Sequence, residues 1–402
     1  MSDDILDLVV VGGGIVGLAT AWQFIQRRPE ARILVLEKEN RLAAHQSSRN
    51  SGVIHSGVYY RPDSLRARNC RRGYRLLLEF CQQYDLPYEI CGKVIVATTP
   101  HEHPVLETLY RRGIANGLGG LRLLTSEETR AIEPHVCATA ALWVPQAGIT
   151  DYRMVAYKLA ELFERAGGNV RTQTRVRRFR TTSEGVHIMA DTWEGMARRV
   201  VTCGGLYADH LALNGGADIS VRILPFRGEF YELVPERRHL VRHLVYPVPH
   251  PSFPFLGVHF TRTLSGAVEA GPNAVLAFRR EGYRLRQAHA GELLQTLSFG
   301  GFWRLARRHW RDGWAELQRS FSKKHFVRAL QRLVPELTVD DIVPTRSGVR
   351  AMACTPDGRL YDDFLLAQTS RILHVCNAPS PAATAALAIG ETIAERLLQM
   401  NT

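Results

Sequence analysis

The order of apolar and polar residues at the start of the chain predicts a βαβ unit. Residues 5–11 form a continuous apolar run rich in β-branched side chains, which is typical of a strand buried on both faces of a parallel sheet. After three glycines, apolar residues recur at helical spacing from Ile15 to about Arg27, and Pro29 ends that helix. A second buried strand is expected over Ile33–Leu36.

Later segments continue to alternate between helical and strand patterns, which predicts two domains interleaved in sequence. A helix should open near residue 126, with Ser126 as its N-cap. Further helices are expected over 66–84, 151–166 and 382–399, and strands over 94–97, 170–179, 185–190, 198–203 and 226–234. We expect an α/β nucleotide-binding domain from 1–90, 150–218 and 341–402, and a sheet-rich α+β substrate domain from 91–149 and 219–340.

A glycine turn joins the first strand to the first helix. Gly12, Gly14 and Gly17 stand in the order G-x-G-x-x-G, and Glu37 follows 20 residues after Gly17. Such glycines permit a tight turn, close approach to a pyrophosphate and close packing of helix on strand, while the helix N-terminus faces the negative charge. An acidic side chain at position 37 can accept hydrogen bonds from a ribose and would repel a 2′-phosphate. The motif predicts a dinucleotide site and leaves FAD and NAD open.

Composition narrows the class of protein without naming a function. The chain has 402 residues, 45% of them hydrophobic, without an apolar run of about 18 residues or a secretory signal. We therefore expect a cytoplasmic protein, or one held on the cytoplasmic face of the inner membrane. Seven cysteines without C-x-x-C spacing argue against a metal site or a disulfide framework. The net charge of +12 suits nucleic acid, anionic lipid or anionic substrates.

Several longer segments resemble one superfamily of enzymes. They are HQSSRNSGVIHSGVYY at 45–60, PFRGE at 225–229, PFLGVH at 254–259, GPNAV at 271–275 and CNAPSPAAT at 376–384. In this order they resemble the FAD-dependent D-amino-acid-oxidase-like superfamily and, within it, the L-2-hydroxyglutarate oxidases/dehydrogenases, over essentially the whole chain. The resemblance implies FAD as cofactor, a Rossmann-like, glutathione-reductase-like FAD domain beside a mixed or antiparallel substrate sheet, and hydride transfer from C2 of L-2-hydroxyglutarate to the flavin, giving 2-oxoglutarate.

The resemblance also implies where FAD makes its contacts. The 46–52 loop should carry the pyrophosphate and ribityl chain past the isoalloxazine, and Val176 should contact adenine. Pro381 should stand in the first turn of a helix whose N-terminus stabilises reduced flavin at its N1–O2 edge. The expected cofactor-binding residues are Gly12, Gly14, Ile15, Val16, Gly17, Glu37, Lys38, His45, Gln46, Ser47, Asn50, Ser51, Gly52, Val176, Cys203, Gly204, Gly348, Ser380, Pro381, Ala382 and Ala383.

Oxidation of a 2-hydroxy acid needs a base for the hydroxyl proton. Histidine suits this task near neutral pH, and His55 follows the flavin loop directly, so we expect it to be the base. His259 is the second candidate, and His55 could instead only hydrogen-bond the flavin. Arginine pairs with carboxylates in bidentate fashion, which suggests Arg227 and Arg350 as substrate-binding residues, each with a surface or structural role as the alternative. Tyr60 could add a hydroxyl.

The stretch 302–333 is basic and rich in tryptophan. It holds nine Lys/Arg and two acidic residues. Trp303, Trp310, Trp314 and Phe321 are spaced by seven, four and seven, which fits one helical face. One hypothesis is an amphipathic segment on an anionic membrane, where electrons could pass to a quinone. The other is an aromatic stripe that faces the core below a solvated basic face.

Two further hypotheses remain open. An amine or imino-acid oxidase of the same fold would share the FAD segments. A basic, flavin-bearing RNA-binding protein would use the stretch 302–333, but the sequence contains no recognised RNA-binding module, so we expect no specific nucleic-acid partner. The electron acceptor, quinone or oxygen, and the oligomeric state are left open by the sequence.

Overall fold

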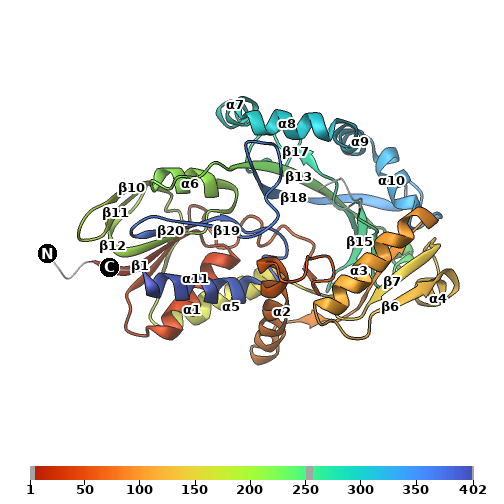
Figure 1. Cartoon of the computed structure of the whole chain (residues 1–402), viewed down its shortest axis with the longest axis horizontal. Helices are drawn as coiled ribbons and strands as arrows, with labels where there is room; N and C mark the ends of the chain where they lie inside the picture. The colour runs from red at the N-terminus through yellow and green to blue at the C-terminus, as the bar shows by residue number, and fades with distance from the viewer. Residues whose placement is uncertain (1–4, 250–256, 401–402) are drawn as a thin grey trace.

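The computed structural model describes residues 5–249 and 257–400, arranged around two large sheets and a small one (Figure 1). Residues 254–256, the start of the 254–259 segment quoted above, lie outside this range, whereas His259 lies within it. The expected fold class is confirmed. A mixed sheet with a parallel core carries the glycine turn, and a second, largely antiparallel sheet is interleaved with it in sequence.

The first sheet has a parallel core in the order β9–β2–β1–β12–β20. A hairpin of β10 and β11 continues it antiparallel beside β12, and β19 pairs antiparallel with β20. Helices α1, α5 and α11 pack together against this sheet (Figure 1). The elements are β1 (Leu6–Val11), α1 (Ile15–Arg27), β2 (Ile33–Leu36), α5 (Tyr152–Arg165), β9 (Asn169–Arg171), β10 (Val176–Thr181), β11 (Val186–Ala190), β12 (Glu194–Thr202), β19 (Leu365–Gln368), β20 (Ile372–Asn377) and α11 (Ala386–Gln399).

The second sheet has the order β17–β13–β16–β15–β14–β5–β7–β6, and β18 pairs with β13 along nearly its whole length. Neighbouring strands run antiparallel except β14 and β5, which are parallel. Its elements are β5 (Lys93–Ala97), β6 (Arg122–Thr125), β7 (Ala140–Val144), β13 (Arg222–Leu233), β14 (Leu244–Pro247), β15 (His259–Arg262), β16 (Val268–Gly271), β17 (Val275–Leu276) and β18 (Ile342–Cys354), with α3 (His103–Ala115) and α4 (Ser126–Ile132) beside it.

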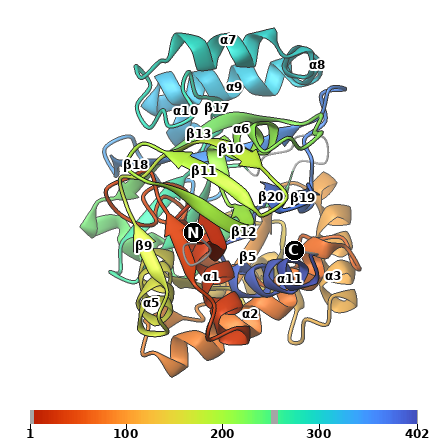
Figure 2. The same cartoon turned by 90° about the vertical axis from the view of Figure 1, so that its left-hand side faces the viewer.

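The remaining elements join or flank the two sheets. The strands β3, β8 and β4 form a small antiparallel sheet in that order. The helices α7 to α10 form a row along one edge of the molecule (Figures 1 and 2). These elements are β3 (Val53–Ile54), α2 (Leu65–Gln83), β4 (Tyr88–Glu89), β8 (Gly148–Thr150), α6 (Ala208–Asn214), α7 (Ala290–Ser298), α8 (Gly300–Arg308), α9 (Trp310–Phe321) and α10 (Lys323–Gln331), with short 3₁₀ turns at Pro100–Glu102, Gly205–Tyr207 and Pro235–Leu240.

The structure differs from the expected elements at three places. Thr125, not Ser126, caps α4, because its hydroxyl accepts from the Glu128 backbone N–H in a capping box. The last helix begins at Ala386, since the preceding turns are closed by hydrogen bonds from Ala382 N to Pro379 O and from Ala385 N to Pro381 O. The strand β18, which the expected boundary at 341 placed in the nucleotide domain, belongs to the second sheet through its pairing with β13.

The stretch 302–333 forms three helices, with breaks at His309 and Ser322. The aromatic side chains that share one predicted face all lie in water: Trp303 is 57%, Trp310 63%, Trp314 62% and Phe321 70% exposed. The expectation of an aromatic stripe that faces the core is therefore wrong. The core contacts of this region come instead from Leu305, Phe326, Val327 and Leu330.

Candidate active site

The glycine turn forms a cradle in which side chains have no room. Gly12 has φ +114°, and a Cβ on it would lie 2.4 Å from the carbonyl oxygen of Cys203. A Cβ on Gly17 would lie 2.0 Å from the carbonyl oxygen of Gly12. Glu37 is buried and accepts a hydrogen bond of 2.8 Å from the Gly13 N–H. The backbone at the start of α1 is thereby open to a ligand that carries phosphates.

One cavity of about 1480 Å³ runs from this turn to the second sheet. It exceeds the roughly 300–1,000 Å³ of most small-molecule pockets, as an extended dinucleotide with a substrate beside it would require. Every expected cofactor-binding residue except Gly52 lines it, and so do His55, Tyr60, His259 and Arg350. Residues from the N-terminus, the middle and the C-terminus of the chain therefore meet around one space.

Gly52 shapes the flavin loop from outside the lining. Its φ is +69°, a Cβ on it would lie 2.7 Å from the carbonyl oxygen of Thr150, and its N–H donates to Asn50 Oδ1 at 2.8 Å. This conformation lets the loop pass close to β8, and the expected contact of Gly52 with the cofactor stays a prediction.

The far end of the cavity gathers polar side chains from both sheets. His55 follows β3, and its backbone N–H donates to the hydroxyl of Thr384 at 3.1 Å. Its Nε2 lies 3.5 Å from the hydroxyl of Ser380. On the opposite side, the ring of His259 stacks on Tyr246 with centroids 3.9 Å apart. The two candidate bases thus line the same cavity, His55 from the segment after β3 and His259 from β15 of the second sheet.

The environment keeps both imidazoles neutral. Burial, with the nearby charges of Lys93 and Arg66, holds the pKa of His55 well below its ordinary value. Burial also lowers the pKa of His259 to about 3, against a smaller opposing effect of its hydrogen bond to Gly257 O. Both rings are therefore unprotonated at neutral pH, which is the form that a general base requires.

Comparison with known proteins identifies the family to which the chain belongs. A family model described as FAD dependent oxidoreductase matches residues 7–396. The chain belongs to this family. It is 47% identical over 393 residues to an L-2-hydroxyglutarate dehydrogenase of Indibacter alkaliphilus, with 98% of each chain covered. It is 43% identical to the L-2-hydroxyglutarate dehydrogenase of Escherichia coli K12 (97% of this chain, 93% of the relative) and to the mitochondrial one of Homo sapiens (98% and 89%).

Solved structures of the DAO family share the fold. An L-α-glycerophosphate oxidase from Mycoplasma pneumoniae with FAD bound superposes with a TM-score of 0.81 at 24% identity, covering 99% of this chain and 96% of the other. A glycine oxidase from Geobacillus kaustophilus gives 0.71 at 19% identity, with 99% and 96% covered. FAD is accordingly the cofactor of this family member. The side-chain-free cradle and the long cavity fit it.

The two candidate arginines separate in the structure. Arg350 of β18 lines the cavity. Arg227 lies outside the lining formed by the described residues, although its neighbour Gly228 is part of it, because successive side chains of β13 point to opposite faces. Arg227 instead pairs with Glu229 at 3.0 Å and reaches Ser320 of α9 at 3.3 Å. The expected contact of Arg227 with the substrate is not supported by this placement.

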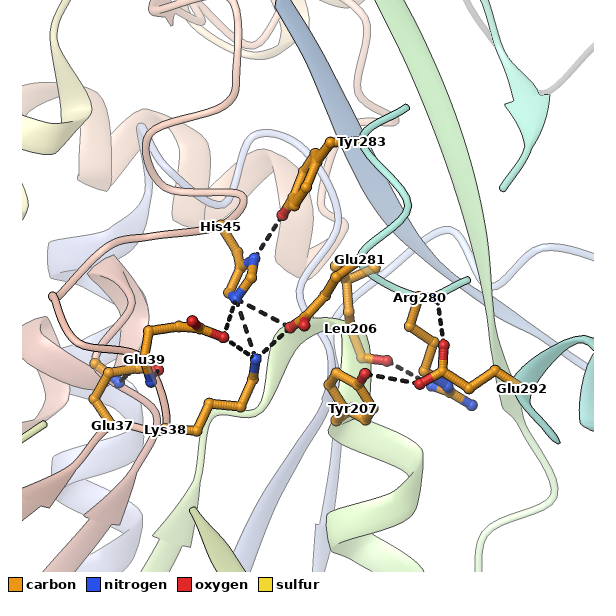
Figure 3. Close-up of polar contacts among 11 residues, drawn as sticks. Glu37, Lys38, Glu39, His45, Leu206, Tyr207, Arg280, Glu281, Tyr283 and Glu292 are labelled. Atoms are coloured by element: carbon orange, nitrogen blue, oxygen red, sulfur yellow. Dashed lines mark hydrogen bonds and ion pairs between the residues drawn. The ribbon is translucent and has the colours of Figure 1, made fainter. Parts of the chain in front are cut away.

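A clasp that sequence reasoning missed joins Lys38 and His45 of the nucleotide half to residues 281–283 (Figure 3). The segment after β17 brings Glu281 to the Lys38 ammonium, at 2.5 Å, and to His45 Nε2, at 3.0 Å. Tyr283 places its hydroxyl 2.6 Å from His45 Nδ1. Burial alone would raise the pKa of Glu281, but His45 and Lys38 lower it to about 2, so the carboxylate stays ionised.

The same segment is anchored on its other side. Arg280 donates to both carboxylate oxygens of the fully buried Asp209, at 2.7 and 2.9 Å. Glu39, His45 and Glu281 also lie close enough together to suggest a metal site, but the ammonium of Lys38 bonds both carboxylates and supplies the positive charge there. The only local signal for this clasp was the adjacency of opposite charges at 280–281, which occurs often by chance.

Proposed function

We propose that this flavoenzyme oxidises L-2-hydroxyglutarate to 2-oxoglutarate. The observation that carries the proposal is the 43–47% identity, over nearly the whole chain, to proteins with this activity. The cavity supports it chemically, because a guanidinium in its wall and two neutral imidazoles suit an anionic hydroxy acid. Ser380, whose hydroxyl lies 3.5 Å from His55 Nε2, would help to hold the imidazole in place, and Thr384 fixes the backbone at His55 by accepting its N–H.

The site residues divide the work between binding and proton transfer. Bound FAD would supply the acceptor for the hydride from C2. Arg350 would bind a carboxylate and orient C2, and Tyr60 would add a hydroxyl. His55 would accept the hydroxyl proton at Nε2, so that loss of the proton and the hydride converts the alcohol to a ketone. His259, on the opposite wall, is the alternative base.

The FAD contacts expected from the sequence complete the proposal. The pyrophosphate would lie against the backbone N–H groups of the glycine turn and the N-terminus of α1. Glu37 would accept from the ribose, and Val176 would pack beside adenine. The turns at 380–383, which line the cavity ahead of α11, would face the flavin ring.

An anaerobic reduction tests the substrate assignment. The yellow holoprotein is mixed without oxygen with L-2-hydroxyglutarate, with its D enantiomer, or with a panel of amines and amino acids. Rapid loss of the flavin's visible absorbance with the L acid alone is expected. Bleaching by an amine, with none by the hydroxy acid, would contradict the assignment and favour an amine oxidase of the same fold.

For the electron acceptor we propose a quinone, reached from an anionic membrane surface on which α7, α8 and α9 rest. No helix among the described residues has the length and apolar character to cross a bilayer. Around the four exposed aromatic residues lie Leu294 of α7, 68% exposed, and the exposed Arg307 and Arg308. Tryptophan favours the interface between headgroups and acyl chains, and arginine attracts anionic lipid, so this surface complements such a membrane.

Vesicle binding tests this partner. The holoprotein should sediment with vesicles containing phosphatidylglycerol and less with pure phosphatidylcholine. The double variant Trp310→Ser/Trp314→Ser should lose most of this binding, whereas Tyr157→Ser, which removes an exposed aromatic on α5, should not. Equal sedimentation of all three proteins would contradict the surface. Tight, steeply salt-dependent binding to RNA instead would favour nucleic acid as the partner of the basic face.

A further inference from the structure

A buried lysine stands behind the wall of the substrate end. Lys93 begins β5 and is 2% exposed. Its Nζ lies 3.9 Å from the centre of the Tyr246 ring and 5.4 Å from that of Tyr59. Tyr246 and Tyr59 line the cavity, whereas Lys93 is not part of the lining found among the described residues. The ammonium therefore sits one aromatic layer away from the space for the substrate.

This ammonium has no anionic partner in the protein as described. Within residues 5–249 and 257–400, no hydrogen bond or ion pair to Lys93 Nζ is present, and its polar contacts are the two aromatic rings. Burial of an unpaired charge is costly, and a cation–π contact offsets only part of that cost. Such an arrangement is expected where the compensating negative charge arrives with a ligand.

The groups that face Lys93 cannot themselves supply that charge near neutral pH. They are the thiols of Cys70 on α2 and of Cys91, the phenols of Tyr59 and Tyr246, and the imidazoles of His55 and His259. Burial raises the pKa of both thiols and both phenols, so they remain uncharged. Arg66, which lowers the pKa of His55, and Arg350, which lowers the pKa of His259, are also positively charged.

We propose that Lys93 is a positioning residue whose positive charge, set behind Tyr246 and Tyr59, favours the binding of the dicarboxylate substrate. This inference rests on the proposed function, since it assigns a charge to the substrate that enters. Lys93 acts through the wall of the cavity, not by contact. Its charge adds to that of Arg350, which lines the same end of the cavity.

The sign of the pH dependence follows from the same geometry. Burial lowers the pKa of Lys93 to about 7 in the protein without substrate. A dianion bound nearby favours the ammonium and raises that pKa, so binding takes up a proton. Affinity for the dianion is then highest when Lys93 is protonated and falls as pH rises above about 7. Loss of the charge should also raise the pKa of His55 and move the acid limb of kcat/KM to higher pH.

The test compares wild-type holoenzyme with Lys93→Met, an apolar replacement of similar length. Glutarate, a dicarboxylate without a hydroxyl to oxidise, is titrated while the flavin spectrum is followed between about pH 6 and pH 9. Wild type should bind it more weakly as pH rises, and Lys93→Met should bind about tenfold more weakly at low pH, with little pH dependence. Lys158→Met, which removes a surface lysine on α5, should match wild type.

A second measurement does not depend on a variant that folds. In weakly buffered solution near pH 8, glutarate binding to wild type should take up protons, detected with an indicator dye. Identical affinity profiles for wild type and Lys93→Met, or no proton uptake by wild type, would overturn this inference alone. Wild-type holoenzyme that binds no dicarboxylate would overturn the proposed function together with it.

Discussion

The two ends of the cavity are built by different means. At the nucleotide end, the backbone makes most of the site. Residues 12–37 supply the glycines of one turn, the start of a helix and one carboxylate directly after the next strand. At the substrate end, side chains make the site, and they come from the segment after β3, from β15 and β18, and from the turns before α11. The first end is a local property of the chain, whereas the second exists only after both sheets have formed.

This difference predicts how each end responds to substitution. A change at the nucleotide end should remove the cofactor, because the backbone has nowhere to move. A change at the substrate end should leave a yellow, folded protein with altered kinetics. The following variants test that division, from the largest expected effect to the smallest.

Gly17→Val should abolish FAD binding. The added side chain would meet the carbonyl oxygen of Gly12, where even a Cβ lies at 2.0 Å. The measurement is the ratio of flavin to protein absorbance after purification. Gly313→Ala in α9, where a Cβ has nothing within 4 Å, is the control and should keep full flavin content. A yellow Gly17→Val protein would show that the cradle tolerates a side chain.

His55→Ala should retain FAD and lower kcat by about 10²–10⁴-fold, the range typical of a lost general base. The measurement is the rate of anaerobic flavin reduction at saturating substrate. His259→Ala should lower it less if His55 is the base. The reverse order would assign proton transfer to His259 and leave His55 with the role of orienting the flavin loop.

Arg350→Met should weaken substrate binding by about 10- to 100-fold, the equivalent of one lost charge-assisted contact. KM and the dissociation constant of glutarate measure this effect. Arg227→Met is the matched comparison, since it removes a guanidinium from the opposite face of the same strand pair. It should leave KM nearly unchanged and lower the melting temperature instead, because Glu229 loses its ion pair.

Glu281→Gln should have the smallest effect, a several-fold faster release of FAD with unchanged kcat. The change removes the negative charge that joins Lys38 and His45 across the nucleotide half. Apoprotein formation in the presence of a flavin scavenger measures the release rate. Glu336→Gln, which alters an exposed pair with His135 far from the cavity, should release FAD at the wild-type rate.

Much of this arrangement was predictable from the chain because the responsible signals are local. Strand, glycine turn and helix at 6–27 follow directly from apolar periodicity and glycine spacing. The cofactor loop and the segment at 376–384 were recognisable by resemblance, and their residues do line the cavity. The last helix was expected to begin at residue 382, because the residues from there on favour a helix. It begins at Ala386 instead, because residues 379–385 form turns that are closed by their own hydrogen bonds.

The residues 302–333 show the limit of periodicity. Spacing alone joined four aromatic side chains into one face but could not say whether that face meets the core or water. Burial is decided by what lies opposite, and the core of this region is filled from β13, β16 and α10. The exposure of the tryptophans is therefore decided by the tertiary structure, although the tryptophans and the basic residues around them are visible in the sequence.

The sequence by itself determined the dinucleotide-binding fold, the cofactor and the presence of a histidine, a residue able to act as a base, at position 55. Each of these depends on residues close together in the chain or on segments that resemble known ones. Only the tertiary structure decided that Arg350 faces the cavity and Arg227 does not, that residues 280–283 clasp the nucleotide half, and that Lys93 lies behind Tyr246. These depend on the side to which each strand turns its side chains and on which strands become neighbours, and both are set by the packing of the whole molecule.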